Sequence, residues 1–568
     1  MSETTVPPEA ASDPTDPAPD PAGPGSDPAA AAPDGSGPGP GVHGRILLAD
    51  RITATGLAPL EEEFELVEAT DLDADGLRAA LADVDAVLVR STTTLDRRAL
   101  EGQQRLRVIG RAGVGVDNID VEAATERGIA VFNAPSGNTA SAAELTLSLM
   151  LAAMRKVPAA DRSMRRGEWD RKRFRGAELL GKTLALVGAG RIGGEVARRA
   201  RAFGMTVIAC DPYLQSERAR QLRIETVSLE DALRRGDVVS LHVPLTDATR
   251  GLISADELAL MKPTAVLINA ARGGVLDEDA LVDALRADRL AGAALDVYAT
   301  EPLPADHPLR SLDNVVLTPH IGAATREAQH NVAHEVAESV RQALLTGDVS
   351  RAINGPAVGG DLIRRAGPLM DLATRLGRIG RALCGAVETV EIRYAGDAGT
   401  DALQPLSAAA LVGVLRDVVG AENVNLVNTG HLARARGLRV SRSLLQADGP
   451  YADYVELRLA GGGCETRVAG AMRGDEPRIV RINDYDVDVR PRGPLVILRN
   501  RDVPGVIGHV GTLLGRAGVN IGEYHQGRVE AGGEALAAIA VDGRLSSELM
   551  RELAALPDIL AVHQVELD

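Results

Sequence analysis

The sequence predicts an α/β protein in which two parallel β-sheets form separate lobes. Short apolar runs of strand length alternate with segments of helical period, as in βα units. This alternation starts twice, near residue 45 and again near residue 183. Gly accounts for 60 of the 568 residues, which is typical of many tight strand-to-helix turns. The length itself exceeds one core and favours about three or four domains.

Residues 1–43 differ from the rest of the chain in composition. They hold seven acidic side chains, eleven prolines and no Lys or Arg. Such a segment cannot bury enough apolar surface to offset the entropy lost on ordering, so we predict a disordered tail. It also lacks the basic start and apolar core of a signal peptide.

Charge, hydropathy and cysteine usage exclude several classes of protein. The net charge of −17 argues against a nucleic-acid partner, because phosphate backbones select basic surfaces. The longest apolar run, residues 142–154, contains Glu144 and is too short for a membrane span. Cys210, Cys384 and Cys464 have neither CxxC nor metal-ligand spacing, so no metal site is predicted. These features favour a cytoplasmic protein with no membrane partner.

The elements of the two lobes are short, apolar and rich in β-branched residues, which predicts strands buried on both faces. In the first lobe these strands are 45–50, 86–91, 107–110 and 129–133. In the second lobe they are 183–188, 206–211, 238–243, 265–269, 292–297 and 315–318. Both lobes are therefore Rossmann-like or flavodoxin-like, and the cleft between two such lobes is a favoured ligand site.

The pattern changes from about residue 355. Residues 355–491 mix helical periods with strand-like pieces such as 454–459 and show no catalytic constellation, which predicts an α+β intervening domain. The last segment follows a βαββαβ order, with helices at 506–516 and 546–555 and a strand at 534–541. The predicted parts are the tail 1–43, a first lobe 44–140 with 325–354, a second lobe 141–324, the intervening domain 355–491 and a small domain 494–568.

A glycine-rich turn follows the strand at 183–188 and opens a helix, with the sequence Gly188-Ala189-Gly190-Arg191-Ile192-Gly193. Its glycines allow a tight turn, close approach of a pyrophosphate and close helix packing, while the helix N-terminus attracts phosphate. Asp211 ends the next strand, where a carboxylate binds both ribose hydroxyls and repels a 2′-phosphate. A glycine turn alone is a weak signal, but strand, turn, helix and acid in this order predict NAD as the cofactor.

Three polar residues each follow a predicted strand of the second lobe. Arg272 lies in segment 269–274, Glu301 in segment 295–302 and His320 in segment 317–323. Because parallel strands end at one edge of a sheet, the three side chains are expected to converge near the nicotinamide.

These three residue types suit the oxidation of a hydroxy acid. His320 can remove the hydroxyl proton, Glu301 can hold the other ring nitrogen, and Arg272 can grip a carboxylate. Each could also be an ordinary loop residue, but their combination behind a glycine turn favours catalysis.

The motifs VGAGRIGG, SLHVPLT, INAARGG, LDVYATEP and TPHIGA together resemble the D-isomer-specific 2-hydroxy-acid dehydrogenase family over residues 45–354. The resemblance implies that Arg272, Glu301 and His320 are catalytic and that Asp296 contacts the nicotinamide amide. The implied cofactor contacts are Gly188, Gly190, Arg191, Ile192, Gly193, Asp211, Ala270, Arg272, Asp296, His320 and Gly322.

Segments 89–93, 110–120 and 133–144 resemble the substrate lobe of family members that oxidise 3-phosphoglycerate. This implies that Arg90, Arg111 and Asn138 bind the substrate's carboxylate and phosphate, for which arginine suits as a bidentate donor. A surface ion pair is the alternative for the two arginines. Val114 departs from the family, which has an NAD-contacting Thr there. Trp169 with the basic run 171–173 resembles a subunit-contact region, or else is a solvated charge run.

Residues 494–568 resemble an ACT domain, a small amino-acid-sensing module. Segments 500–505 and 518–521 match its ligand loop and helix end, which implies that Asp502, Gly505 and Asn520 bind an amino-acid effector. Serine-sensing relatives often have Asn where Asp502 stands, so the ligand is left open. A structural dimerisation domain without a ligand is the alternative.

The expected function is NAD-dependent oxidation of 3-phospho-D-glycerate to 3-phosphohydroxypyruvate, the entry to serine synthesis, by a homotetramer that L-serine inhibits. One alternative is a glyoxylate or hydroxypyruvate reductase, against which the ACT domain argues. A second is an NAD-sensing protein without turnover, which the intact Arg272, Glu301 and His320 disfavour. A pure amino-acid-binding regulator would not explain the two Rossmann-like lobes.

Overall fold

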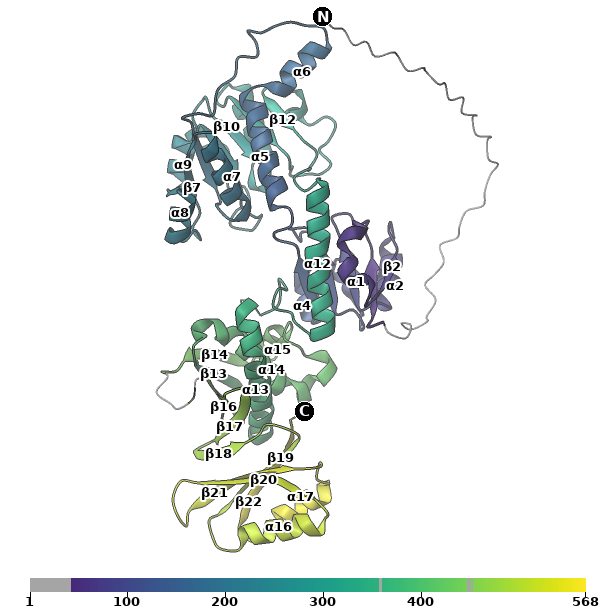
Figure 1. The fold of residues 1–568 in the computed structure, drawn as a ribbon, viewed down its shortest axis with the longest axis vertical. Helices are drawn as coiled ribbons and strands as arrows, with labels where there is room; N and C mark the ends of the chain where they lie inside the picture. The colour runs from purple at the N-terminus through teal and green to yellow at the C-terminus, as the bar shows by residue number, and fades with distance from the viewer. Residues whose placement is uncertain (1–41, 357–359, 447–450, 452, 568) are drawn as a thin grey trace, which may run out of the picture. The chain divides into compact units, whose positions relative to one another are not determined.

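The computed structural model describes residues 42–356, 360–446, 451 and 453–567 (Figure 1). The predicted tail therefore lies almost wholly outside the described residues.

The first lobe is built on a parallel sheet of five strands in the order β2-β1-β3-β4-β5, the flavodoxin-like order. Its strands are β1 (Arg45–Leu48), β2 (Glu65–Glu68), β3 (Ala86–Val89), β4 (Val108–Arg111) and β5 (Ala130–Asn133). Its helices are η1 (Ala54–Gly56), α1 (Ala58–Glu61), α2 (Ala74–Ala82), α3 (Arg97–Leu100) and α4 (Val121–Glu126). The long helix α12 (Arg326–Thr346) also packs on this sheet, through Val332, Val336 and Val340.

The second lobe has a parallel sheet of seven strands in the Rossmann order β12-β11-β10-β9-β6-β7-β8. The strands are β6 (Thr183–Val187), β7 (Thr206–Cys210), β8 (Glu225–Thr226), β9 (Val238–Leu241), β10 (Val266–Asn269), β11 (Gly292–Leu295) and β12 (Val315–Leu317). The helical elements are α5 (Thr139–Met154), α6 (Val157–Arg165), α7 (Arg191–Ala202), α8 (Ser216–Leu222), α9 (Leu229–Arg235), α10 (Ala255–Leu260), η2 (Gly273–Val275), α11 (Glu278–Arg286) and η3 (Pro308–Ser311). Strand order reverses between β6 and β9, which places a ligand crevice at the carboxyl ends of these strands.

The predicted α+β segment is a mixed sheet in the order β14-β13-β15-β16-β17-β18, in which only β13 and β14 are parallel neighbours. Its strands are β13 (Thr389–Ala395), β14 (Arg439–Leu444), β15 (Tyr454–Gly461), β16 (Cys464–Arg473), β17 (Glu476–Ile482) and β18 (Tyr485–Val489). Its helices are α13 (Gly360–Cys384), η4 (Gly399–Ala402), α14 (Leu403–Val419), η5 (Ala421–Asn423) and α15 (Thr429–Ala435).

One helical segment within this domain, Gly399–Val419, was not singled out from the sequence. It has 21 residues and a mean hydropathy of 1.4, so by length and composition alone it could cross a membrane. However, 61% of its 18-residue apolar window is buried within the fold, where Leu406, Ala410 and Val414 join the core beside α13. Such burial is typical of a core helix, whose apolar side chains contact the protein interior.

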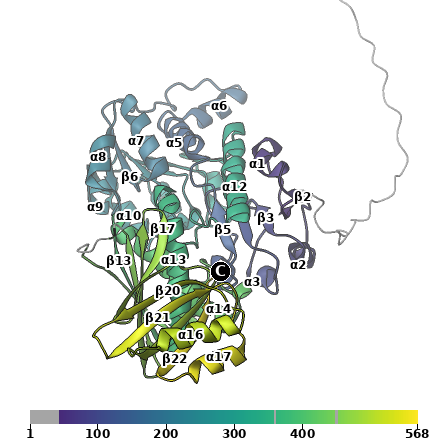
Figure 2. The same ribbon diagram turned by 60° about the horizontal axis from the view of Figure 1, so that its bottom comes forward.

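The last segment has the predicted βαββαβ order: β19 (Pro494–Arg501), α16 (Val506–Arg516), β20 (Ile521–Arg528), β21 (Glu534–Val541), α17 (Ser547–Ala554) and β22 (Ile559–Glu566). Its antiparallel sheet has the order β20-β21-β19-β22, and both helices lie on one face of it (Figure 2). Leu495, Ile497 and Leu536 on the opposite face join the core cluster that contains α13 and β13.

Candidate active site

The glycine turn has the geometry that a dinucleotide requires. Gly188 has a φ of +94°, and a Cβ there would come within 2.7 Å of the His242 carbonyl oxygen, so the turn admits only glycine. A Cβ on Gly193 would lie 2.4 Å from the Gly188 oxygen, whereas one on Gly190 would meet open space. Gly190 is the N-cap residue of α7, and it provides no side chain to cap the helix. The first N–H groups of α7 are thus free to bind a pyrophosphate, and the turn fits NAD.

Asp211 lies directly after β7, beside the glycine turn. Its Oδ2 accepts a hydrogen bond from the Ala189 N–H at 2.8 Å, and its Oδ1 accepts one from the Tyr213 N–H at 2.8 Å. The carboxylate therefore also holds the turn in place, a role that the sequence did not indicate. Each oxygen keeps a second lone pair that a ribose hydroxyl can use.

His320 and Glu301 form a hydrogen-bonded pair. His320 Nδ1 lies 2.7 Å from Glu301 Oε2, and Glu301 Oε1 accepts the Tyr298 N–H at 3.0 Å. The imidazole is half exposed, so the pairing leaves Nε2 as the ring nitrogen that can face a substrate. His320 has a φ of +53°, a left-handed conformation that is rare outside glycine.

Asp296 explains how the loop around His320 is held. Its side chain is only 1% exposed. Its Oδ1 accepts bonds from the Thr318 hydroxyl at 2.6 Å and the Ile321 N–H at 2.8 Å, and its Oδ2 accepts the Gly322 N–H at 2.9 Å. Hydrogen bonds to a charged acceptor are the strong ones, so this carboxylate determines the shape of the loop. The predicted contact between Asp296 and the nicotinamide stays a prediction.

The Arg272 loop packs backbone to backbone against the loop that carries Glu301. A Cβ on Gly273 would fall 2.0 Å from both the carbonyl carbon and the oxygen of Tyr298, so only glycine fits. The Asn269 side chain braces the same turn, donating to the Arg272 oxygen at 3.0 Å and accepting the Ala271 N–H at 3.1 Å. The structure therefore brings together the loops of the three residues that the sequence predicts to be catalytic.

Sequence reasoning missed a second buried acid behind these loops. Glu278 is 9% exposed, and its Oε1 accepts the Ala299 N–H at 2.5 Å. Burial raises the pKa of Glu278, and burial also raises the pKa of Tyr298 to about 12, so its hydroxyl remains a donor to the Thr318 oxygen at 2.9 Å. An acid in the first turn of a helix is common, so no sequence signal distinguished Glu278.

In the first lobe, the glycines that follow Arg111 make room for two guanidinium groups. A Cβ on Gly113 would fall 1.5 Å from Arg111 Nη1, and one on Gly115 would fall 2.3 Å from Arg272 Nη2. Arg272 Nε also lies 3.4 Å from Asp117 Oδ2. These glycines therefore let the two guanidinium groups lie close against the loop, and both contacts are with side-chain ends that can shift.

Arg90 is positioned by two residues that the sequence did not single out. Asp50 Oδ2 accepts the Arg90 N–H at 2.5 Å and the Thr93 N–H at 3.2 Å. The Asn118 amide donates to the Arg90 oxygen at 2.7 Å and to the Thr93 oxygen at 2.6 Å. The segment after β3 is thus held on both sides, which fixes the backbone from which the Arg90 side chain extends.

Arg111 lies among charges of both signs, with Arg272 and Arg90 acting against Asp117 and Asp50. Burial, together with the charges of Arg272 and Arg90, lowers the pKa of Arg111. Within the described residues, Arg111 Nε, Asn138 Oδ1 and Thr139 Oγ1 are buried without a hydrogen-bond partner. Buried polar atoms are normally satisfied, so these groups suit an anionic ligand that also accepts and donates hydrogen bonds.

Comparisons with known proteins agree with this geometry. Residues 147–322 match the family model of the D-isomer specific 2-hydroxyacid dehydrogenase NAD binding domain, 365–483 that of the D-3-phosphoglycerate dehydrogenase intervening domain, and 495–558 that of the ACT domain. The D-3-phosphoglycerate dehydrogenase of Methanocaldococcus jannaschii is 41% identical over 525 residues, which cover 92% of this chain and 100% of that protein. The chain belongs to the D-3-phosphoglycerate dehydrogenase family. It is an NAD-dependent oxidoreductase with an ACT regulatory domain.

A second dehydrogenase and a solved reductase structure show how much of the chain each likeness covers. The Bacillus subtilis enzyme of that name is 40% identical over 527 residues, 92% of this chain and 99% of that protein. A glyoxylate reductase structure from Paecilomyes thermophila has a TM-score of 0.51 and 34% identity, and covers 54% of this chain and 97% of its own. The likeness to the reductase is therefore limited to about half of the chain, whereas the likeness to the dehydrogenases covers nearly all of it.

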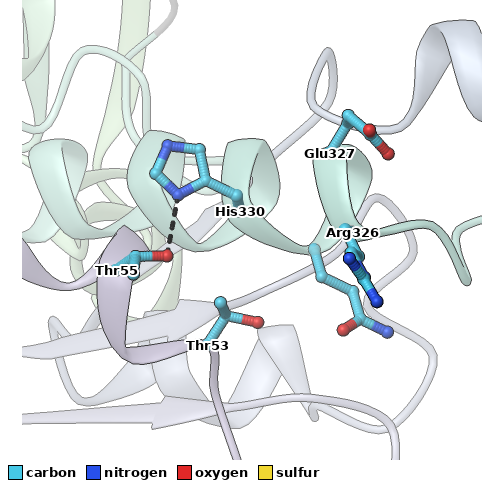
Figure 3. Close-up of a pocket in the computed structure, with 6 residues that line it drawn as sticks. Thr53, Thr55, Arg326, Glu327 and His330 are labelled. Carbon is cyan, nitrogen blue, oxygen red and sulfur yellow. Dashed lines mark hydrogen bonds between the residues drawn. The ribbon is translucent and has the colours of Figure 1, made fainter. Parts of the chain in front are cut away.

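One hollow in the structure contains none of the predicted catalytic residues, so pocket shape alone does not locate the candidate active site. This hollow, of about 460 Å³, lies between η1 and the start of α12, where His330 Nδ1 is 3.1 Å from Thr55 Oγ1 (Figure 3). It is lined by Thr53, Thr55, Arg326, Glu327, Gln329 and His330. None of these residues was predicted from the sequence. The catalytic assignment therefore depends on the hydrogen-bonded pair and the glycine turn.

The structure does not bring the predicted ACT ligand residues together within one chain. Asp502 and Gly505 lie at the start of α16, where Asp502 Oδ2 accepts bonds from Arg528 Nη1 at 3.3 Å and the Gly532 N–H at 3.2 Å. Asn520 lies beyond the other end of α16 and donates to Asp542 at 2.8 Å. Since α16 has 11 residues, the two ends are about 16 Å apart.

His242, beneath the glycine turn, predicts a pH effect on stability. Burial lowers the pKa of His242 from 6.5 to about 4. Between these values the unfolded chain binds a proton that the folded protein does not, so the free energy of unfolding should fall by about 3 kcal/mol as the pH drops through this window. Urea unfolding at neutral and acidic pH should show this loss, and His242→Gln should lose less. An identical loss in both proteins would contradict the assignment.

Proposed function

We propose that this chain oxidises 3-phospho-D-glycerate to 3-phosphohydroxypyruvate with NAD, as the first step of L-serine biosynthesis. The supporting observation is that Arg272 and Arg90 act on Arg111, whose Nε is buried without a partner among the described residues, as is Asn138 Oδ1. This substrate carries a carboxylate and a phosphate, both of which arginine binds bidentately. The names of the full-length relatives agree with this substrate.

The proposed mechanism divides the work among three side chains. NAD, when bound at the glycine turn, supplies the hydride acceptor. His320 Nε2 takes the hydroxyl proton, while Glu301 fixes the tautomer through Nδ1 and stabilises the imidazolium that forms. Arg272 holds the substrate carboxylate and orients the reacting carbon. The remaining proposed cofactor contacts are Gly188, Gly190, Arg191, Ile192, Gly193, Asp211, Ala270, Asp296 and Gly322.

We also propose the domain boundaries, the setting and the assembly inferred from the sequence. The first lobe, 44–140 with 325–354, binds substrate, and 141–324 binds NAD; an intervening domain, 355–491, and an ACT domain, 494–568, follow. The enzyme is proposed to be a cytoplasmic homotetramer. Trp169, in the predicted subunit-contact region, is 77% exposed, and such a large apolar side chain favours a contact with another copy.

Arg111 provides the test of the substrate. Arg111→Gln should raise KM for 3-phosphoglycerate by about 10–100-fold, because it removes a charged hydrogen-bond donor from a buried site. The Kd for NADH should not change. The control is Arg107→Gln, whose side chain is 55% exposed and pairs with Asp85 at 3.6 Å. Steady-state NADH formation from 3-phosphoglycerate and from D-glycerate measures both effects, and equal kcat/KM for the two substrates would favour the glyoxylate or hydroxypyruvate reductase alternative.

L-serine is proposed to bind the ACT domain at an interface between two copies. The supporting observation is the separation of Asp502 and Gly505 from Asn520 within one chain, so that a site using all three requires a second copy. Isothermal titration should detect serine binding, and serine should reduce activity by about 5–150-fold, the usual range of allosteric coupling. Asn520→Ala should abolish both effects without changing kcat. Absence of serine binding to the intact oligomer would remove the sensor proposal.

A further inference from the structure

Two of the three cysteines, 80 residues apart in the sequence, lie side by side. Cys384 ends α13 and Cys464 begins β16. Cys384 Sγ lies 3.6 Å from the Cys464 carbonyl oxygen, and Cys464 Sγ lies 3.9 Å from the Leu383 oxygen. The Cys464 side chain is also close enough to contribute to the raised pKa of Cys384. Cys384 Sγ therefore lies against the backbone of Cys464, and Cys464 Sγ lies against the residue before Cys384, a proximity from which a disulfide can form.

We propose that Cys384 and Cys464 are an oxidisable pair that forms an intramolecular disulfide, with a hydroperoxide as the oxidant. The bond would join the last turn of α13 to the hairpin of β15 and β16. The pair lies outside every catalytic, cofactor and substrate residue described above, so the inference is independent of the proposed function.

The surroundings of the two thiols determine their order of reaction. Cys384 is only 8% exposed, whereas Cys464 is partly exposed. Burial and the neighbouring Cys464 raise the pKa of Cys384 to about 12, so this thiol stays protonated at neutral pH. Cys464, the more exposed of the two thiols, therefore reacts first with the oxidant, and Cys384 then attacks the product and loses its proton as the S–S bond forms.

The reaction balances in two steps. The Cys464 sulfur attacks the peroxide: an S–O bond forms, the O–O bond breaks, and the leaving oxygen departs as water with the thiol proton. The Cys384 sulfur then attacks the Cys464 sulfenic acid: the S–S bond forms, the S–O bond breaks, and a second water leaves with the Cys384 proton. The two thiols lose two electrons, and hydrogen peroxide is reduced to two molecules of water.

Cys210 is an internal control for this pair. It lies at the end of β7 beside Asp211, in the second lobe. Burial and the Asp211 charge raise the pKa of Cys210, which disfavours its thiolate. It should therefore remain a thiol under conditions that oxidise Cys464.

The experiment treats the reduced full-length protein with hydrogen peroxide, alkylates the remaining thiols and maps the digest by mass spectrometry. We expect a peptide pair joined through Cys384 and Cys464 that dithiothreitol separates, and an alkylated Cys210. Cys384→Ser should leave Cys464 as a sulfenic acid that dimedone traps, while Cys210→Ser should behave like the unchanged protein. Sulfinic Cys464 without a linked peptide, links between molecules only, or two unreacted thiols would each overturn the proposal.

Thermal unfolding supplies a second readout. A disulfide that closes a loop of this length restricts the unfolded chain, so the oxidised protein should melt at a higher temperature than the reduced protein. Cys210→Ser should retain the increase, and Cys464→Ser should lose it. Equal melting temperatures of the oxidised and reduced proteins would contradict the stabilisation expected from this disulfide.

Discussion

Replacement of His320 with Asn is expected to lower kcat by about 10²–10⁴-fold, the usual contribution of a general base. Asn retains a polar side chain of similar size but cannot take the hydroxyl proton. The variant also loses the hydrogen bond between the imidazole ring and Glu301, which is 2.7 Å long. Glu301→Gln weakens the same pair but keeps the base, so it should lower kcat by a smaller factor. Initial rates of NADH formation measure the loss.

The binding of NADH distinguishes a lost catalyst from a damaged fold. His320→Asn should bind NADH with nearly unchanged affinity in a fluorescence titration, because the glycine turn proposed to hold the pyrophosphate lies on a different loop. His334→Asn is the matched control, since His334 is exposed on α12 and stacks only on His330 at 6.1 Å. Unchanged turnover in His320→Asn would refute the assignment of the base.

Replacement of Gly273 with Ala is expected to impair both folding and catalysis. The new Cβ would lie 2.0 Å from the Tyr298 carbonyl and 2.5 Å from the Ala299 nitrogen, and backbone atoms cannot move aside as a side chain can. Overpacking of this kind should reduce the free energy of unfolding by about 1–3 kcal/mol. Separation of the Arg272 and Glu301 loops by about 1 Å should also cost about 100-fold in kcat/KM.

The adjacent residue, Gly274, provides the control. A Cβ there would meet the Leu245 side chain at 3.2 Å and 3.3 Å and Arg250 Nη1 at 3.6 Å, and both side chains can adjust. Gly274→Ala should therefore change stability and kcat/KM little in urea unfolding and steady-state assays. Similar losses in the two variants would show that the effect is one of glycine flexibility, and not of the contact between the two loops.

The buried parts of the fold were predictable from the sequence because they depend on local patterns. Each parallel strand that is buried on both faces produces an apolar run, and all ten predicted strands of the two lobes are present. The two missed strands are β2, which is half exposed, and β8, which has two exposed residues. Neither carries an apolar run, because each is an edge strand with fewer neighbours to bury it.

Much of the candidate site could be predicted in the same way. Arg272, Glu301 and His320 follow strands whose carboxyl ends meet at one sheet edge, so their sequence positions already imply convergence. Asp50 and Glu278 carried no such signal, because acids beside strand and helix ends are common. Their role in holding the site loops follows from their burial and from the hydrogen bonds that they accept from backbone N–H groups.

By itself, the sequence determined the two parallel sheets, the glycine turn, the βαββαβ segment and the order of the proposed catalytic side chains, since periodicity and turn residues act over a few neighbours. Only the tertiary structure decided that Asp296 holds the His320 loop, that Gly273 touches Tyr298, and that Cys384 meets Cys464. These contacts join residues distant in the chain, and their distances are set by how whole elements pack, which local composition does not encode.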